Sequence, residues 1–99
     1  MNVEFLSPAE QEFFEAIDYL NSESEGLGYE FAIEVQRTIE RIIQYPNAWH
    51  QLSRRTRRCR TKRFPYSIIY QIRTDKILII AIMHMHRNPL HWKSRITSL

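Results

Sequence analysis

The hydrophobic period changes near Leu52, and this change constrains the fold more than any other feature of the sequence. Before Leu52, apolar residues recur at steps of three and four, which is the spacing of one face of an α-helix. After it, residues 66–72 (YSIIYQI) and 76–86 (KILIIAIMHMH) have the apolar runs typical of β-strands. Because 99 residues can bury only one modest core, we expect a single domain over residues 1–99 with helices packed on a sheet.

The first helix has a start signal at Ser7, Pro8 and Glu10. Ser7 is suited to cap the free amides, Pro8 to the first helical position, and Glu10 to complete a capping box. The pattern predicts a helix from this point to about Asn21. Its buried stripe consists of four residues: Ala9, Phe13, Ile17 and Leu20.

The two glycines, Gly26 and Gly28, mark a short connection to a second helix. That helix ends before Tyr45-Pro46, because the residue before a proline is restricted to extended conformations. Its stripe consists of Phe31, Ala32, Val35, Ile39 and Ile42. The short connection predicts an antiparallel helical hairpin.

The strands predict an α+β fold. A short N-terminal strand, half-buried through Val3 and Phe5, precedes the first helix. Residues 54–63, 66–72 and 76–86 then form a three-stranded antiparallel meander, with both helices packed on one face of a twisted sheet. The run 77–83 is apolar on both faces, which indicates a strand covered on both sides, either by this chain or by a partner.

The charges divide between the two halves of the chain. Residues 1–50 hold ten acids and two bases, whereas residues 51–99 hold twelve bases and one acid, for a net charge of +3. A basic surface of this kind favours an anionic partner, nucleic acid before membrane.

Other global features indicate a cytoplasmic protein. The single cysteine, Cys59, argues against a disulfide-stapled secreted domain. The N-terminal residues lack the pattern of a signal peptide. The longest apolar run has seven residues, too few to span a membrane, so we expect no membrane partner.

Residues 54–63 (RRTRRCRTKR) carry seven Arg or Lys residues in ten positions. On a strand, Arg58, Arg60 and Lys62 share one face, and Cys59 and Thr61 share the other. The small, uncharged pair then faces the helices, which leaves Cys59 inert and aligns the cations for a phosphate backbone. The alternative is a charged edge strand that protects the sheet against aggregation.

Two histidines, His84 and His86, lie at the end of the last strand. Histidine titrates near neutral pH, so beside phosphate-binding cations either could transfer a proton in metal-independent RNA cleavage with the 2′-hydroxyl as nucleophile. The alternatives are packing at the end of the sheet, or a metal site for which further ligands are missing nearby. We expect no metal and no cofactor.

Aromatic side chains are interleaved with the bases. Tyr66 and Trp92 are candidates to stack on an unpaired base, and for Tyr66 a place in the core is equally open. Tyr70 is expected in the core, because Ile68 and Ile72 share its strand face.

Besides the order of strand, helical hairpin and meander, the chain contains two characteristic sequence blocks. These are FPYxIIY at residues 64–70 and IIAIxHxxRxPxxWxxR at residues 79–95. Together they resemble the RelE/ParE superfamily of toxins from bacterial toxin-antitoxin modules. The resemblance implies a toxin that inhibits growth, takes part in plasmid stabilization and is held inactive by a cognate antitoxin.

The superfamily has two branches with different targets. The RelE-like branch cleaves mRNA in the ribosomal A site, whereas the ParE-like branch poisons DNA gyrase without being a nuclease. In the cleaving branch, cations on the first meander strand and beyond the last strand match Arg58, Arg60 and Arg87, and Trp92 is the counterpart of the tail aromatic. The arginine that this branch carries after the strand's tyrosine is Ser67 here, which removes a cation that would stabilise the transition state.

The leading expectation is therefore an endoribonuclease (mRNA interferase) acting on the ribosome. Three arginines, Arg58, Arg60 and Arg87, would hold the scissile phosphate, and His84 or His86 would transfer the proton. The expected RNA-binding residues are Lys62, Arg63, Tyr66 and Trp92. The alternatives are an inhibitor of DNA gyrase with no catalytic residue and a nucleic-acid-binding member without toxicity.

Overall fold

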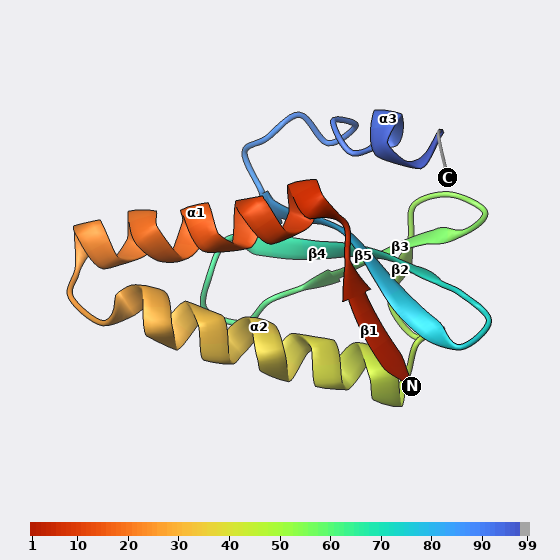
Figure 1. Ribbon diagram of the computed structural model, residues 1–99, viewed down its shortest axis with the longest axis horizontal. Helices are drawn as coiled ribbons and strands as arrows, with labels where there is room; N and C mark the ends of the chain where they lie inside the picture. The colour runs from red at the N-terminus through yellow and green to blue at the C-terminus, as the bar shows by residue number, and fades with distance from the viewer. Residues whose placement is uncertain (98–99) are drawn as a thin grey trace.

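The fold is a five-stranded sheet with a helical hairpin on one face and the C-terminal segment on the other (Figure 1). The structure is a computed structural model and describes residues 1–97. In chain order the elements are β1 (Asn2–Phe5), α1 (Ser7–Glu23), α2 (Leu27–Gln44), β2 (His50–Gln51), β3 (Thr56–Arg60), β4 (Tyr66–Ile72), β5 (Lys76–His84) and α3 (Lys93–Ile96). Within residues 1–97, no helix combines the length and the apolarity that a membrane span requires.

The predicted meander is confirmed: β3 pairs antiparallel with β4, and β4 with β5. The sheet order is β1-β5-β4-β3-β2, so two further strands extend it at the edges. Strand β1 lies parallel to β5, with Val3 opposite Ile77. The two-residue strand β2 pairs antiparallel with β3. The sheet is therefore mixed, and β5 occupies an interior position between β1 and β4.

The first helix begins at Ser7 itself, so the prediction that Ser7 caps it is wrong. The capping position is Leu6, in an extended conformation and without a side-chain hydrogen bond to the helix end. The carbonyl of Leu6 accepts the Glu10 amide at 3.0 Å. Pro8 lies in the first turn, where a missing amide leaves no hydrogen bond unmade. The helix ends at Glu23, two residues beyond the predicted end.

The helices form the predicted antiparallel hairpin, and both glycines have a physical role in it (Figure 1). Gly26 precedes α2 with a φ of 84°, a left-handed conformation that glycine adopts without steric cost. Gly28 lies in the first turn of α2, close to α1. Its amide donates to Asn21 Oδ1 at 2.8 Å.

The main core lies between the hairpin and the sheet. Phe31 and Tyr70 are fully buried in it, and the Tyr70 hydroxyl donates to the Pro46 carbonyl at 2.6 Å. Burial raises the pKa of Tyr70 to about 12. Cys59 faces this core with 2% exposure, as predicted, and burial raises the pKa of its thiol.

A second, smaller core lies on the opposite face of the sheet. The C-terminal segment, residues 88–97, covers this face with Trp92 and Ile96, and Figure 1 shows α2 and α3 on opposite sides of the sheet. The strand residues of this core are Ile69, Leu78, Ile80, Ala81 and Met83. The apolar run in β5 is therefore covered on both sides by the chain itself.

Candidate functional site

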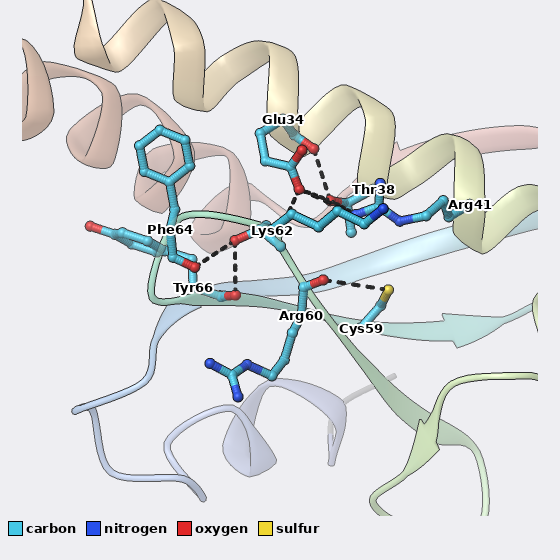
Figure 2. A network of polar contacts seen from close by, with 9 residues as sticks. Glu34, Thr38, Arg41, Cys59, Arg60, Lys62, Phe64 and Tyr66 are labelled. Atoms are coloured by element: carbon cyan, nitrogen blue, oxygen red, sulfur yellow. Dashed lines mark hydrogen bonds and ion pairs between the residues drawn. The ribbon is translucent and has the colours of Figure 1, made fainter.

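The first candidate site, called here the Arg60 hollow, lies on the face that the C-terminal segment covers. It has a volume of about 190 Å³ and is lined by Arg58, Arg60, Ser67, Met83, Met85 and Pro89. The strand register produces this arrangement, because Arg60 pairs with Ser67 and Ser67 with Met83. Figure 2 shows the Arg60 side chain extending away from α2, on the opposite side of the strand from Glu34.

The centre of the Arg60 hollow is poor in charge. Ser67 is only 5% exposed and supplies a small hydroxyl between Arg60 and Met83. Arg58 is half-buried and Arg60 is exposed. The hollow therefore offers two guanidinium groups along one wall, a pattern suited to an anionic surface.

The second candidate site, called here the His84 hollow, lies on the helix face of the sheet. It has a volume of about 150 Å³ and is lined by Glu12, Glu15, Ala16, Tyr19, Tyr66, Ile82, His84 and Arg87. Tyr66 and His84 are register partners, and their rings meet edge to face with centroids 5.1 Å apart. Tyr66 is 8% exposed, and burial raises its pKa.

His84 is held in its neutral form. Burial, followed by the charges of His86 and Arg87, lowers the pKa of His84. Its Nδ1 accepts the His86 amide at 3.1 Å, so the neutral ring carries its proton on Nε2. His86 is exposed in the turn after β5, with its ring centroid 5.1 Å from that of His84.

The predicted catalytic residues thus fall into two groups on opposite faces of the sheet. Arg58 and Arg60 line the Arg60 hollow, whereas His84 and Arg87 line the His84 hollow. The cause is the alternation of side chains along a strand: Met83 faces the C-terminal segment, so its neighbour His84 faces α1. The structure brings the histidines together with Arg87 but not with the arginines of β3.

Lys62 and Arg63 lie in the loop between β3 and β4, next to α2. The Lys62 amide donates to the Glu34 carboxylate, which also accepts from Thr38 at 3.1 Å and from Arg41 at 3.2 Å (Figure 2). Burial raises the pKa of Glu34, but these hydrogen bonds outweigh it and hold the pKa below its usual value.

Arg63 is oriented by its own local contacts. Its φ of 69° is in the left-handed region, it forms an ion pair with Glu30 at 3.4 Å, and its guanidinium carbon lies 5.1 Å from the centre of the Phe64 ring. Both Arg63 and Glu30 are exposed, so the pair adds little stability. These contacts place Arg63 beside α2, and it is not among the residues that line the Arg60 hollow.

The position of Trp92 differs from the prediction that it stacks on an unpaired base. It is only 2% exposed, and its indole N–H donates to the Pro89 carbonyl at 2.7 Å. A ring buried against the sheet presents no face to a nucleotide base. Trp92 is therefore a core residue of the C-terminal segment rather than a stacking platform.

Sequence reasoning missed Glu12 and Tyr19, which α1 contributes to the His84 hollow. They flank Ala16 at steps of four and three, the spacing of a second helical stripe beside the predicted one. A search for polar residues on that flank could have found them. Within residues 1–97, no three side chains of the metal-binding types come together.

The comparisons with known proteins identify the family. A family model described as the ParE toxin of type II toxin-antitoxin systems, parDE, matches residues 3–89. The chain belongs to the ParE toxin family. This membership confirms the superfamily inferred from the two sequence blocks, and it implies an antitoxin partner.

Solved structures show the same fold at low sequence identity. A chain of the chromosomal ParDE system from P. aeruginosa has 14% identity and a TM-score of 0.76, over 87% of this chain and 97% of that one. The isolated E. coli RelE toxin has 13% identity and a TM-score of 0.65, over 99% of this chain and 98% of that one. No curated protein matches at a significant level.

Proposed function

We propose that this ParE family chain arrests growth in the cytoplasm by binding DNA gyrase without catalysis, and that a cognate antitoxin neutralises it. The observation that carries the proposal is the division of the candidate residues between two faces of the sheet. Family membership adds support, because the resemblance implies gyrase inhibition for the ParE-like branch.

This arrangement of residues is poorly suited to RNA cleavage. A general base must reach the 2′-hydroxyl proton within about 3 Å while cations contact the phosphate next to it. Here Arg58 and Arg60 lie across the sheet from His84. Ser67 leaves the centre of the Arg60 hollow without a further cation.

A binding function needs only a complementary surface. The Arg60 hollow and the exposed Arg87 lie at the same end of the sheet, at the Arg60-Ser67-Met83 register and just beyond His84. Exposed arginines of this kind attract an acidic protein surface and speed association, which becomes slower as salt is added.

The second candidate is cleavage of mRNA on the ribosome. One observation favours it: neutral His84, with its lowered pKa, shares a hollow with Arg87 and Tyr66. In that case the base and one cation would come from the His84 hollow alone, while Arg58 and Arg60 would hold the RNA strand.

Induced expression of the chain tests the two candidates directly. Under gyrase inhibition, pulse-labelled protein synthesis continues at first while DNA damage and filamentation appear, and the purified chain inhibits supercoiling by purified gyrase. An immediate collapse of protein synthesis, with gyrase unaffected, would contradict the proposal.

Substitutions in the two hollows sharpen this test. Arg60→Ala removes an exposed charge of the binding surface, and we expect it to raise the concentration for half-inhibition of gyrase about tenfold. His84→Gln is expected to leave inhibition and growth arrest unchanged, because no proton transfer is involved. Arg37→Ala, an exposed arginine on α2, is the matched control. Loss of growth arrest in a folded His84→Gln variant would favour cleavage.

A further inference from the structure

A third hollow, called here the Arg73 pocket, lies at the opposite end of β3 from the Arg60 hollow. It has a volume of about 280 Å³ and is lined by Ser53, Arg54, Arg55, Gln71, Arg73 and Ile96. It opens on the same face of the sheet as the Arg60 hollow, because Ile96 belongs to the second core. None of its residues takes part in the two sites described above.

One arginine of the pocket is held in place by buried groups. Gln71 is 4% exposed; its Oε1 accepts from Arg73 Nη2 at 2.7 Å, and its Nε2 donates to Thr56 Oγ1 at 3.0 Å. The Arg73 amide also donates to the Lys76 carbonyl at 2.8 Å. Because the Gln71 side chain holds the guanidinium, Arg73 loses less conformational freedom when it binds a ligand.

The same arginine has an unused donor. Among residues 1–97, Arg73 Nε is buried and has no hydrogen-bond partner. A buried donor without an acceptor is costly and is rare in native proteins. A ligand oxygen that accepted a hydrogen bond from Arg73 Nε would therefore bind with a more favourable free energy.

The charge of the pocket is also uncompensated. Its lining contains three guanidinium groups and no carboxylate, and none of the three arginines forms an ion pair within residues 1–97. Arg54 and Arg55 are exposed, so they can move toward a ligand beside the fixed Arg73. An anion would relieve the repulsion among the three groups.

We propose that the Arg73 pocket binds a phosphate group. Guanidinium forks match the oxygen geometry of phosphate, and Ser53 adds a hydroxyl donor to the lining. The group can come from a free phosphate compound or from a nucleic-acid backbone. Strand β3 runs from this pocket to the Arg60 hollow, and the stretch from Arg55, just before the strand, to Arg60 spans about 17 Å. A single nucleic-acid strand could therefore follow β3 from one hollow to the other.

Nuclear magnetic resonance of the arginine Nε–Hε groups tests the proposal on the full chain. Inorganic phosphate, a mononucleotide and a short single-stranded oligonucleotide are titrated separately at constant ionic strength. We expect a saturable shift of the Arg73 resonance with phosphate. Tighter binding of the oligonucleotide than of the mononucleotide would identify the backbone as the source, and equal binding would identify the free compound.

Variants make the outcome decisive. Combined Arg54→Ala and Arg55→Ala, both at exposed positions, should weaken phosphate binding about tenfold or more. Arg73→Lys keeps the charge but loses the fork, and should weaken it as well. Arg37→Ala on α2 removes the same charge elsewhere and should leave binding unchanged. The proposal is overturned by an unsaturable shift, by equal binding in the Arg54 and Arg55 variant, or by acetate or an acidic peptide binding as well as phosphate.

Discussion

Gly28 lies where the two helices of the hairpin leave no room for a side chain. A Cβ atom there would lie 2.2 Å from the Ile17 carbonyl oxygen and 2.7 Å from Asn21 Cγ. The first of these neighbours is backbone, which a side-chain rotation cannot relieve. Glycine at this position therefore sets the close approach of α2 to α1.

We predict that Gly28→Ala lowers the free energy of unfolding by about 1–3 kcal/mol, because the helices must separate to admit the methyl group. Urea denaturation measures the change. Tyr29→Ala, at the next position and 68% exposed, is the control and should cost much less. An alanine at position 28 with wild-type stability would show that the helices do not meet as described.

The C-terminal segment is attached to α1 through one carboxylate. Glu12 accepts two hydrogen bonds from Arg95, both at 2.8 Å, one from His91 at 3.1 Å and one from the Ile82 amide at 3.1 Å. Burial raises the pKa of Glu12, but these partners outweigh it and hold the pKa below 4.5. The helix, the strand β5 and the segment over the second core therefore meet at one charged group.

We predict that Glu12→Gln lowers the free energy of unfolding by about 2–3 kcal/mol near neutral pH, because Arg95 is left half-buried without its counter-charge. The stabilisation by Glu12 is complete above the unfolded-state pKa and is lost as the pH falls through the lower folded-state pKa. The difference between wild type and variant should therefore shrink below pH 4.5.

Denaturation curves at several pH values measure this difference, and hydrogen exchange of residues 88–97 should become faster in the variant at neutral pH. Glu15→Gln, at an exposed position of the same helix, is the control. A difference that does not change with pH would argue against the Glu12 contacts.

The whole molecule consists of two cores separated by one sheet, and its charges divide along the chain. The acidic residues lie almost entirely in the half of the chain that forms the helices, and the bases in the half that forms the meander and the C-terminal segment. The smaller core depends on a segment of ten residues, 88–97, in which Trp92 is the largest buried side chain. Loss of this segment would expose the apolar residues of β5 that face it.

We predict that Trp92→Ala lowers the free energy of unfolding by about 3–5 kcal/mol, because it removes the main side chain over the second core. Urea denaturation followed by circular dichroism measures the loss. Leu90→Ala, on the same segment and 53% exposed, is the control. If the variant kept its stability and only lost binding, Trp92 would be a functional residue instead.

Local patterns were enough to predict most elements. The steps of three and four placed both helices, and the alternation in residues 54–63 correctly turned Cys59 inward. The prediction of a cap at Ser7 failed because the helix begins one residue earlier than such a cap requires, which leaves Leu6, a residue without a capping side chain, at that position. The start of a helix depends on the backbone conformation of a single residue, which the local sequence pattern does not determine.

The sequence by itself determined the two helices, the meander, the uneven distribution of charge and the resemblance to the toxin superfamily, because these depend on neighbours along the chain. Only the tertiary structure decided that β1 pairs with β5, that Trp92 is buried, and that His84 and Arg60 lie on opposite faces. Each depends on the register between strands or on packing between distant segments. A shift of one residue in that register reverses the face of every side chain.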